Sequence, residues 1–97
     1  FKFHGYIPID INDKELYIKK MMRSIKEEQE TQIFIETPYR NKQLLKSLLK
    51  TLDKKNRLCL AINLTGSKEE IICDSIENLR RKKTIDIDKQ LCIFLVN

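Results

Sequence analysis

The sequence predicts a small α/β (α+β-like) domain in which a five-stranded mixed sheet is flanked by three to four helices. Short apolar runs rich in β-branched residues alternate with helically spaced segments, as in strand–helix units. Two of these runs are apolar without alternation. Residues 33–35 indicate a strand buried on both faces, and residues 58–62 indicate an interior strand. A short turn joins the second run to another strand, which indicates a mixed sheet. The 97 residues suffice for one domain with a single core.

The first predicted elements are a strand over residues 1–7 and a long helix. Pro8 ends the strand because it lacks a backbone donor for the ladder. Asp13 is the expected N-cap of the helix, which should run to about Glu30. One apolar stripe supports this helix, formed by Ile18, Met21, Met22 and Ile25.

The chain is organised around residues 32–40, where a strand turns directly into a helix. The apolar run 33–35 ends at Glu36 and Thr37, and Pro38 fixes the corner. Helical spacing then follows in Leu44, Leu45, Leu48, Leu49 and Leu52. Such a corner lies at the carboxyl end of the sheet, where open α/β folds bind ligands. The same residues are equally compatible with a plain strand-to-helix turn.

The second half should contain three strands and a short helix. Residues 57–63 form the second interior strand, and Gly66 is the turn residue expected to take a positive φ. A strand over residues 69–74 follows, and Ser75 can cap a helix that ends in the basic cluster at residues 80–83. Residues 84–89 are a loop or a short strand, and residues 91–96 are the last strand.

Composition indicates a cytoplasmic domain with a solvated surface. Hydrophobic residues make up 41% and charged residues 34%, with no apolar run long enough to span a membrane and no signal peptide. The net charge of +5 permits nucleic-acid contact, but the basic residues are scattered among acidic ones. Cys59, Cys73 and Cys92 are predicted to be buried, reduced core residues, because their number and spacing suit neither a disulfide framework nor a metal site.

The residues that could perform chemistry amount to half of a site. His4 is the single histidine, no glycine-rich phosphate loop is present, and metal-ligand spacing is absent. The chain opens within a strand without an initiator methionine. We therefore interpret it as a single domain, residues 1–97, of a longer protein that carries the other half.

Three segments of the sequence resemble the C-terminal domain of the tetrapyrrole (corrin/porphyrin) methylase family of S-adenosylmethionine-dependent methyltransferases. They are FHGYIP at residues 3–8, IFIETPYR at 33–40 and AINLT at 61–65. Within that family they look most like the branch that methylates a ribose 2′-oxygen in small-subunit ribosomal RNA. Thr37 and Tyr39 replace that branch's serine and histidine, and Asn63 replaces its glutamate.

The resemblance implies the C-terminal half of a two-domain, class III methyltransferase whose cofactor lies in an interdomain cleft. Cofactor contacts would come from the two strand ends, at Ile35, Glu36, Thr37, Ala61, Asn63 and Leu64. Substrate contacts would come from His4, Gly5, Tyr6 and Thr65. The substrate would be RNA or, alternatively, a corrin or porphyrin, and the full-length protein would be a homodimer. The 97 residues alone should be inactive and bind S-adenosylmethionine weakly or not at all.

Two polar residues at the central corner are the candidate catalytic groups. Glu36 could polarise a ribose hydroxyl, or it could instead stabilise the start of the helix near Asn41. Arg40 could pair with Glu36 or be held for an anionic substrate, since a guanidinium suits a phosphate. A different class of function, a non-enzymatic homodimeric interaction module, would require these corners to be buried with no cleft beside them.

Overall fold

The computed structural model describes residues 1–82 and 85–97 and confirms the predicted α/β architecture. The elements in chain order are β1 (Lys2–Tyr6), α1 (Ile11–Glu28), β2 (Gln32–Ile35), the short 3₁₀ helix η1 (Pro38–Arg40), α2 (Asn41–Thr51), β3 (Arg57–Ile62), β4 (Glu70–Ser75), α3 (Ile76–Arg81) and β5 (Cys92–Val96). In these described residues, no helix is both long enough and apolar enough to cross a bilayer.

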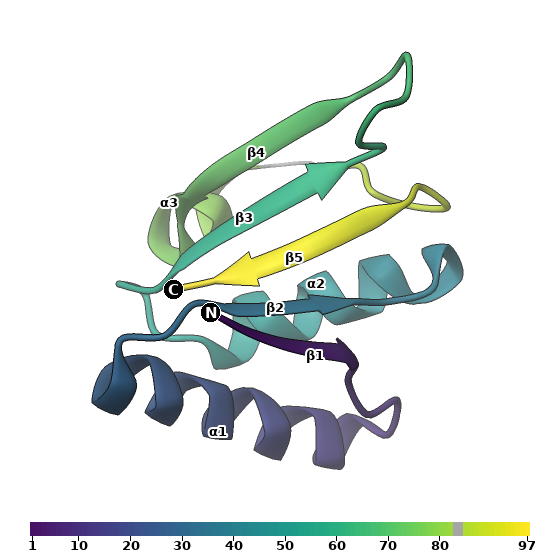
Figure 1. The fold of residues 1–97 in the computed structure, drawn as a ribbon. Coiled ribbons are helices and arrows are strands. Elements are labelled where there is room, and N and C mark those ends of the chain that lie inside the picture. Colours follow the sequence, from purple (N-terminus) through teal and green to yellow (C-terminus); the bar gives the residue numbers. More distant parts are fainter. Residues whose placement is uncertain (83–84) are drawn as a thin grey trace.

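The last strand, β5, is inserted in the middle of the sheet (Figure 1). The strand order is β1-β2-β5-β3-β4, with β1 and β2 parallel and the other neighbouring pairs antiparallel. Strands β1, β2 and β3 therefore point the same way, and β5 begins where they end. This topology brings four separate parts of the chain together at one end of the strands.

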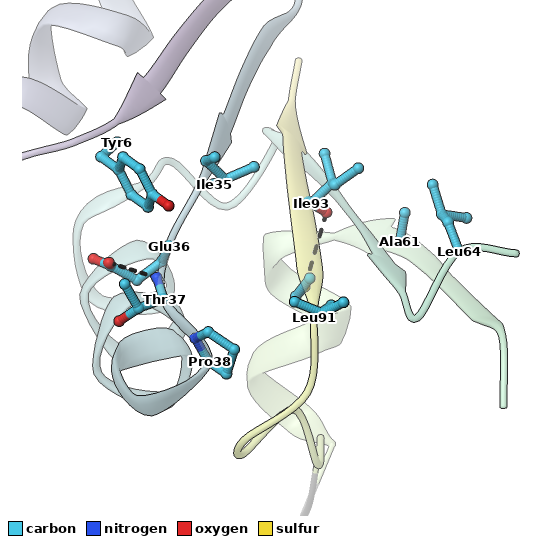
Figure 2. A pocket seen from close by; sticks show the side chains of 10 residues that line it. Tyr6, Ile35, Glu36, Thr37, Pro38, Ala61, Leu64, Leu91 and Ile93 are labelled. Atoms are coloured by element: carbon cyan, nitrogen blue, oxygen red, sulfur yellow. Dashed lines mark hydrogen bonds between the residues drawn. The ribbon is translucent and has the colours of Figure 1, made fainter. Parts of the chain in front are cut away.

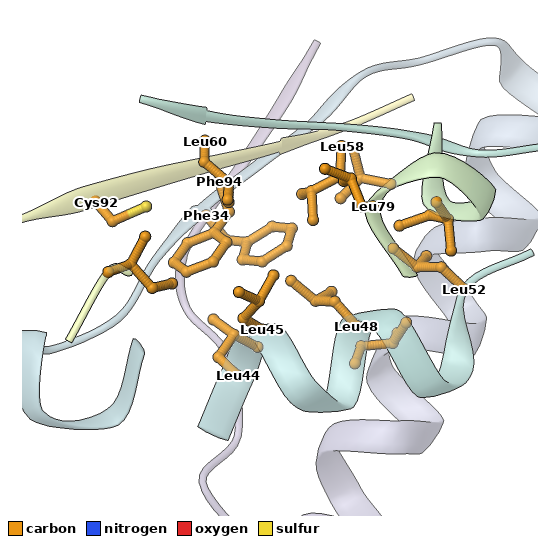
Figure 3. Packing of buried hydrophobic residues seen from close by; sticks show 14 of the residues in the cluster. Phe34, Leu44, Leu45, Leu48, Leu52, Leu58, Leu60, Leu79, Cys92 and Phe94 are labelled. Carbon is orange, nitrogen blue, oxygen red and sulfur yellow. The ribbon is translucent and has the colours of Figure 1, made fainter. Parts of the chain in front are cut away.

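The helices pack on one face of the sheet, and the hydrophobic core lies between the two layers. Phe34 of β2 and Phe94 of β5 stack with their ring centroids 5.5 Å apart. Figure 3 shows these rings above the leucines of α2, with Leu58 and Leu60 of β3 beside them. The side chains of Phe34, Phe94, Leu58 and Leu60 are each 0% exposed. The predicted leucine stripe of α2 therefore forms the floor of the core.

The opposite face of the sheet is apolar and open to solvent. Ile33 and Ile35 are only half-buried, although the apolar run predicted a strand covered on both sides. The prediction was wrong on this point because the described helices all cover the face that carries Phe34. Phe3 and Ile71, on strands at the two edges, are 61% and 65% exposed on this open face.

Local hydrogen bonds correct several of the predicted boundaries. The N-cap of α1 is Asp10 rather than Asp13, and its carboxylate accepts the backbone N–H groups of Asn12 and Asp13 at 3.0 and 3.1 Å. Ser75 caps α3 as predicted, by accepting the N–H of Asn78 at 3.1 Å. Of the segment at 83–89, residues 83 and 84 lie outside the described part of the chain, and residues 85–89 contain no strand.

The cysteines differ most from the prediction. Cys59 of β3 and Cys73 of β4 face each other directly across the two strands, with Cα atoms 4.0 Å apart, and form a disulfide. Cys59 is half-buried and Cys73 is exposed, whereas Cys92 is free and buried as predicted. The wide spacing in sequence concealed the pair because the register of two antiparallel strands brings the two residues together.

Candidate functional site

A pocket of about 350 Å³ opens at the edge where β1, β2 and β3 end and β5 begins. Tyr6 lines it from β1, residues 35–38 from the central corner, Ala61 and Leu64 from the end of β3, and residues 91–93 from the start of β5. The segments that line the pocket are far apart in the sequence. Their side chains are mostly apolar, and neither a lysine nor an arginine is among them.

The floor of the pocket is a row of side chains on the open face of the sheet. Ile35, Ile93 and Ala61 are register partners on the adjacent strands β2, β5 and β3. Figure 2 shows Tyr6 at one end of this row and Leu64 at the other. The row offers a flat apolar platform about three strand spacings wide, which spans roughly 10–15 Å. A planar, largely apolar group can lie against such a surface.

A backbone irregularity at Gly5 directs Tyr6 into the pocket. Phe3 pairs with Ile33 in the regular register, but Tyr6 rather than Gly5 pairs with Ile35. Gly5 has a φ of 68°, in the left-handed region that glycine adopts without steric cost. The extra residue moves Tyr6 to the same face as Ile35, as β-bulges generally re-aim a side chain. Without the shift, Tyr6 would point towards the helices.

The polar wall of the pocket is formed by Glu36 and Thr37. The Glu36 side chain is only 1% exposed, and its Oε1 accepts the backbone N–H of Thr37 at 2.8 Å. Glu36 Oε2 and Thr37 Oγ1 are buried without a partner among the described residues. Buried acceptors of this kind are costly unless a ligand or water satisfies them. Both oxygens are closed off from solvent, so Glu36 and Thr37 line the pocket through their other atoms.

Arg40 is paired with Glu36 and does not line the pocket. Its Nε lies 3.3 Å from Glu36 Oε1, and its side chain is 36% exposed. Of the two roles expected for Arg40, the structure contains the ion pair. Neither η1 nor α2 has a side-chain hydrogen bond at its N-cap, so Glu36 does not cap α2 directly. The carboxylate instead binds the N–H of the next residue and the guanidinium one turn later.

Asn63 stands beside the pocket and holds its far wall in place. Its φ of 50° is left-handed, which asparagine tolerates better than most residues. The Asn63 amide donates to Gln90 Oε1 at 2.6 Å, and its Oδ1 accepts the N–H of Leu91 at 3.3 Å. Asn63 therefore fixes the start of β5 rather than lining the pocket itself.

Three of the four residues expected at the substrate lie outside the pocket. His4 points to the helical side, where its ring nitrogens bond Tyr17 Oη at 2.7 Å and Gln32 Oε1 at 2.6 Å. Gly5 contributes the bulge described above, and Thr65 binds Glu69 Oε1 through its backbone N–H at 3.0 Å. Tyr6 is the member of this group that lines the pocket.

Sequence reasoning did not include Pro38, Leu91, Cys92 or Ile93 among the site residues, although all four line the pocket. The last three were predicted as strand residues, but their position in the sheet was not. Only the insertion of β5 between β2 and β3 brings its first residues to the pocket. Pro38 was recognised as part of the corner and could have been assigned to the site with its neighbours.

The fold of this chain is similar to part of a methyltransferase of known structure. No family model matches the sequence. No curated protein matches it either. Over its full length, the chain is similar to a solved structure of the methyltransferase CobJ, with a TM-score of 0.55 and 14% sequence identity. It covers 41% of the CobJ chain, about two fifths of its length. The likeness supports the fold that the three sequence segments suggested.

Proposed function

We propose that this chain forms one half of the cofactor and substrate cleft of an S-adenosylmethionine-dependent methyltransferase. The main support for the proposal is that residues from separate segments of the chain meet at one pocket. Residues expected at the cofactor from two separate segments, Ile35–Thr37 and Ala61 with Leu64, line a single pocket. The likeness to part of a methyltransferase supports the same conclusion. The non-enzymatic alternative required corners without a cleft, whereas a pocket lies beside both corners.

In this proposal the chain binds and orients the cofactor. The apolar platform of Ile35, Ile93 and Ala61 would receive the adenosine portion, and Tyr6 would close one end of it. S-adenosylmethionine itself supplies a methyl group on a positively charged sulfur. Because methyl transfer is an in-line displacement, orientation and exclusion of water are the main contributions that this half could make.

For the substrate, the lining of the pocket supports a tetrapyrrole better than the RNA ribose. A ribonucleic acid substrate calls for cations around the cleft, because phosphate contacts dominate its affinity. Among the described residues, none that lines the pocket is cationic, and the nearby Arg40 is neutralised by Glu36. An apolar, extended ring system would instead suit the largely apolar lining beside the cofactor. RNA methylation remains the alternative, for which Arg40 would have to leave Glu36.

The experiment is an NMR titration of the 97-residue chain with S-adenosylhomocysteine. We expect saturable shifts of the Ile35, Ala61 and Ile93 amides at millimolar concentrations, since only half of the proposed cleft is present. Ala61→Phe should abolish these shifts because the larger ring fills the pocket. The matched control is Ile71→Phe, a substitution at the register partner of Ala61 that lies outside the pocket and should leave them unchanged.

Two results would contradict the proposal. The absence of saturable shifts at the pocket would exclude a cofactor site there. Micromolar affinity would show that the chain holds a complete site and would refute the assignment to one half of a cleft. Parallel titrations with a porphyrin polycarboxylate and a short single-stranded RNA would decide the substrate class, and stronger perturbation of the pocket by RNA would favour the alternative.

A further inference from the structure

A second hollow, separate from the first pocket, lies between the N-terminal half of α1 and one side of α2. Its volume is about 460 Å³, within the range of small-molecule sites, which is about 300–1,000 Å³. Lys14 and Glu15 line it from α1, and Lys46, Ser47 and Lys50 line it from α2. It shares no lining residue with the first pocket. Its lining carries three cations and one carboxylate.

Lys14 is the unexpected residue in this hollow. It is 3% exposed, and it precedes Ile18 by one helical turn on the stripe of α1 that faces the core. A residue at that position is normally apolar. Here the alkyl stem of Lys14 is buried, while its ammonium is not among the buried polar atoms and can reach the hollow. No hydrogen bond or ion pair joins the Lys14 ammonium to any residue within 1–82 or 85–97. Lys14 is thus more than nine-tenths buried, lacks a partner and lines a hollow.

The other charges of the hollow leave an excess of two cations. Lys50 is neutralised by Glu15, with Lys50 Nζ 3.0 Å from Glu15 Oε1. Lys46, which is exposed, has no ion-pair partner in the described part of the chain. Lys14 and Lys46 together therefore present two uncompensated ammonium groups from facing helices. Two positive charges are balanced by one dianion, and ammonium groups bind phosphate as point charges without demanding a fixed geometry.

We propose that this hollow is a binding site for the dianionic phosphate of a small phosphate monoester. Lys14 would contact the phosphate from below, Lys46 from the rim, and the Ser47 hydroxyl would add a neutral hydrogen bond. Ile9 and Ile11, each 60% exposed, border the hollow and offer an apolar surface to the rest of the ligand. The same charges would suit inorganic phosphate, and the experiment distinguishes the two sources.

The test is an NMR titration of the 97-residue chain at constant ionic strength with methyl phosphate, inorganic phosphate and dimethyl phosphate. Methyl phosphate should shift the amides of Lys14, Lys46 and Ser47 with millimolar affinity. Dimethyl phosphate, a diester with a single negative charge, should bind at least tenfold more weakly. Tighter binding of inorganic phosphate than of methyl phosphate would reassign the site to the free anion and overturn the monoester proposal.

The decisive variant is Lys14→Met, which places an apolar side chain of similar length on the core stripe. It should fold, unfold at the same or a higher temperature than the parent chain, and lose at least tenfold in affinity for methyl phosphate. Lys42→Met is the matched control, because Lys42 is an exposed lysine of α2 outside the hollow. It removes the same charge and should change affinity less than twofold.

Three further results would overturn the proposal. These are an absence of saturable shifts with methyl phosphate, unchanged affinity in Lys14→Met, and an equal loss in Lys42→Met, which would indicate attraction by the overall positive charge alone. None of these results bears on the methyltransferase proposal, whose probe and variants concern the other pocket.

Discussion

Gly5 is the residue on which the position of Tyr6 depends. Its φ of 68° accompanies the register shift of β1, and a Cβ atom built there meets nothing within 4 Å. The cost of a substitution is therefore conformational rather than steric. We expect Gly5→Ala to lower the free energy of unfolding by about 1–2 kcal/mol, the penalty for a left-handed residue with a side chain. Urea denaturation measures this difference.

Gly5→Asn provides the control, because asparagine tolerates the left-handed region better than alanine does. It should destabilise the chain less than Gly5→Ala. If the two variants were equally destabilised, or if neither were, the strained backbone would not be the cause and the bulge would have another origin.

Cys92 belongs both to the lining of the pocket and to the hydrophobic core. Burial raises the pKa of Cys92 to about 12, from an ordinary value of 9.0. A raised pKa in the folded state means that folding favours the neutral thiol, so the stabilisation is complete below pH 9 and is lost as the pH rises towards 12. We expect the unfolding free energy to fall over this interval. The loss should be smaller in Cys92→Ala, as measured by urea denaturation at stepwise pH, and equal losses would contradict the assignment.

At the scale of elements, the disulfide joins the edge strand β4 to β3. The two cysteines are 14 residues apart in sequence, and a loop of that length gives about 3 kcal/mol of stabilisation when it is closed. Reduction should therefore lower the unfolding free energy by about 2–3 kcal/mol. Denaturation with and without dithiothreitol measures the effect. A Cys59→Ala/Cys73→Ala double variant should be insensitive to the reductant, and an equal response from both chains would show that the effect lies elsewhere.

The elements show which features were predictable from the sequence. Apolar patterning predicted each α-helix and strand of the described residues, because burial of one face imposes it, but it did not predict the 3₁₀ helix η1. It also located the corner at Glu36 and Thr37. The sequence could not indicate that β5 enters between β2 and β3, since strand order depends on long-range pairing. For the same reason it missed residues 91–93 of the pocket and the pairing of Cys59 with Cys73.

Turn geometry was the least predictable local feature. Gly66 was expected to carry the positive φ between β3 and β4. In the structure Asn63 and Thr65 have left-handed values of 50° and 65° instead. Gly66 is needed for close approach, because a Cβ atom there would lie 3.1 Å from the Asn63 carbonyl oxygen. Gly66 correctly predicted the position of the turn, but the reason for a glycine there was not the predicted one.

At the scale of the whole molecule, the single-sided packing of the helices shapes the functional surface. Helices cover one face of the sheet, so the row of Ile35, Ile93 and Ala61 remains open and becomes the floor of the pocket. Had the interior strands been covered on both faces, as their apolar runs predicted, these side chains would be core residues. The partial exposure of these strands and the presence of a ligand surface therefore have the same cause.

The open face also bears on the homodimer that the sequence resemblance implies. Five strands with a spacing of about 4.8 Å and lengths near five residues give a face of roughly 400 Å². Two copies packed face to face would bury about 800 Å², below the roughly 1,200–2,000 Å² of stable interfaces. The face alone is therefore too small to hold two copies together tightly, and a full-length dimer would need further surface.

We accordingly expect the 97-residue chain to sediment as a monomer at micromolar concentrations in analytical ultracentrifugation. Weak self-association should emerge only at far higher concentrations, and Ile71→Lys should suppress it by placing a charge on the open face. Lys42→Met, on the helical layer, is the control that should leave sedimentation unchanged. A tight dimer that survives Ile71→Lys would mean that another surface, on the helical side, mediates association.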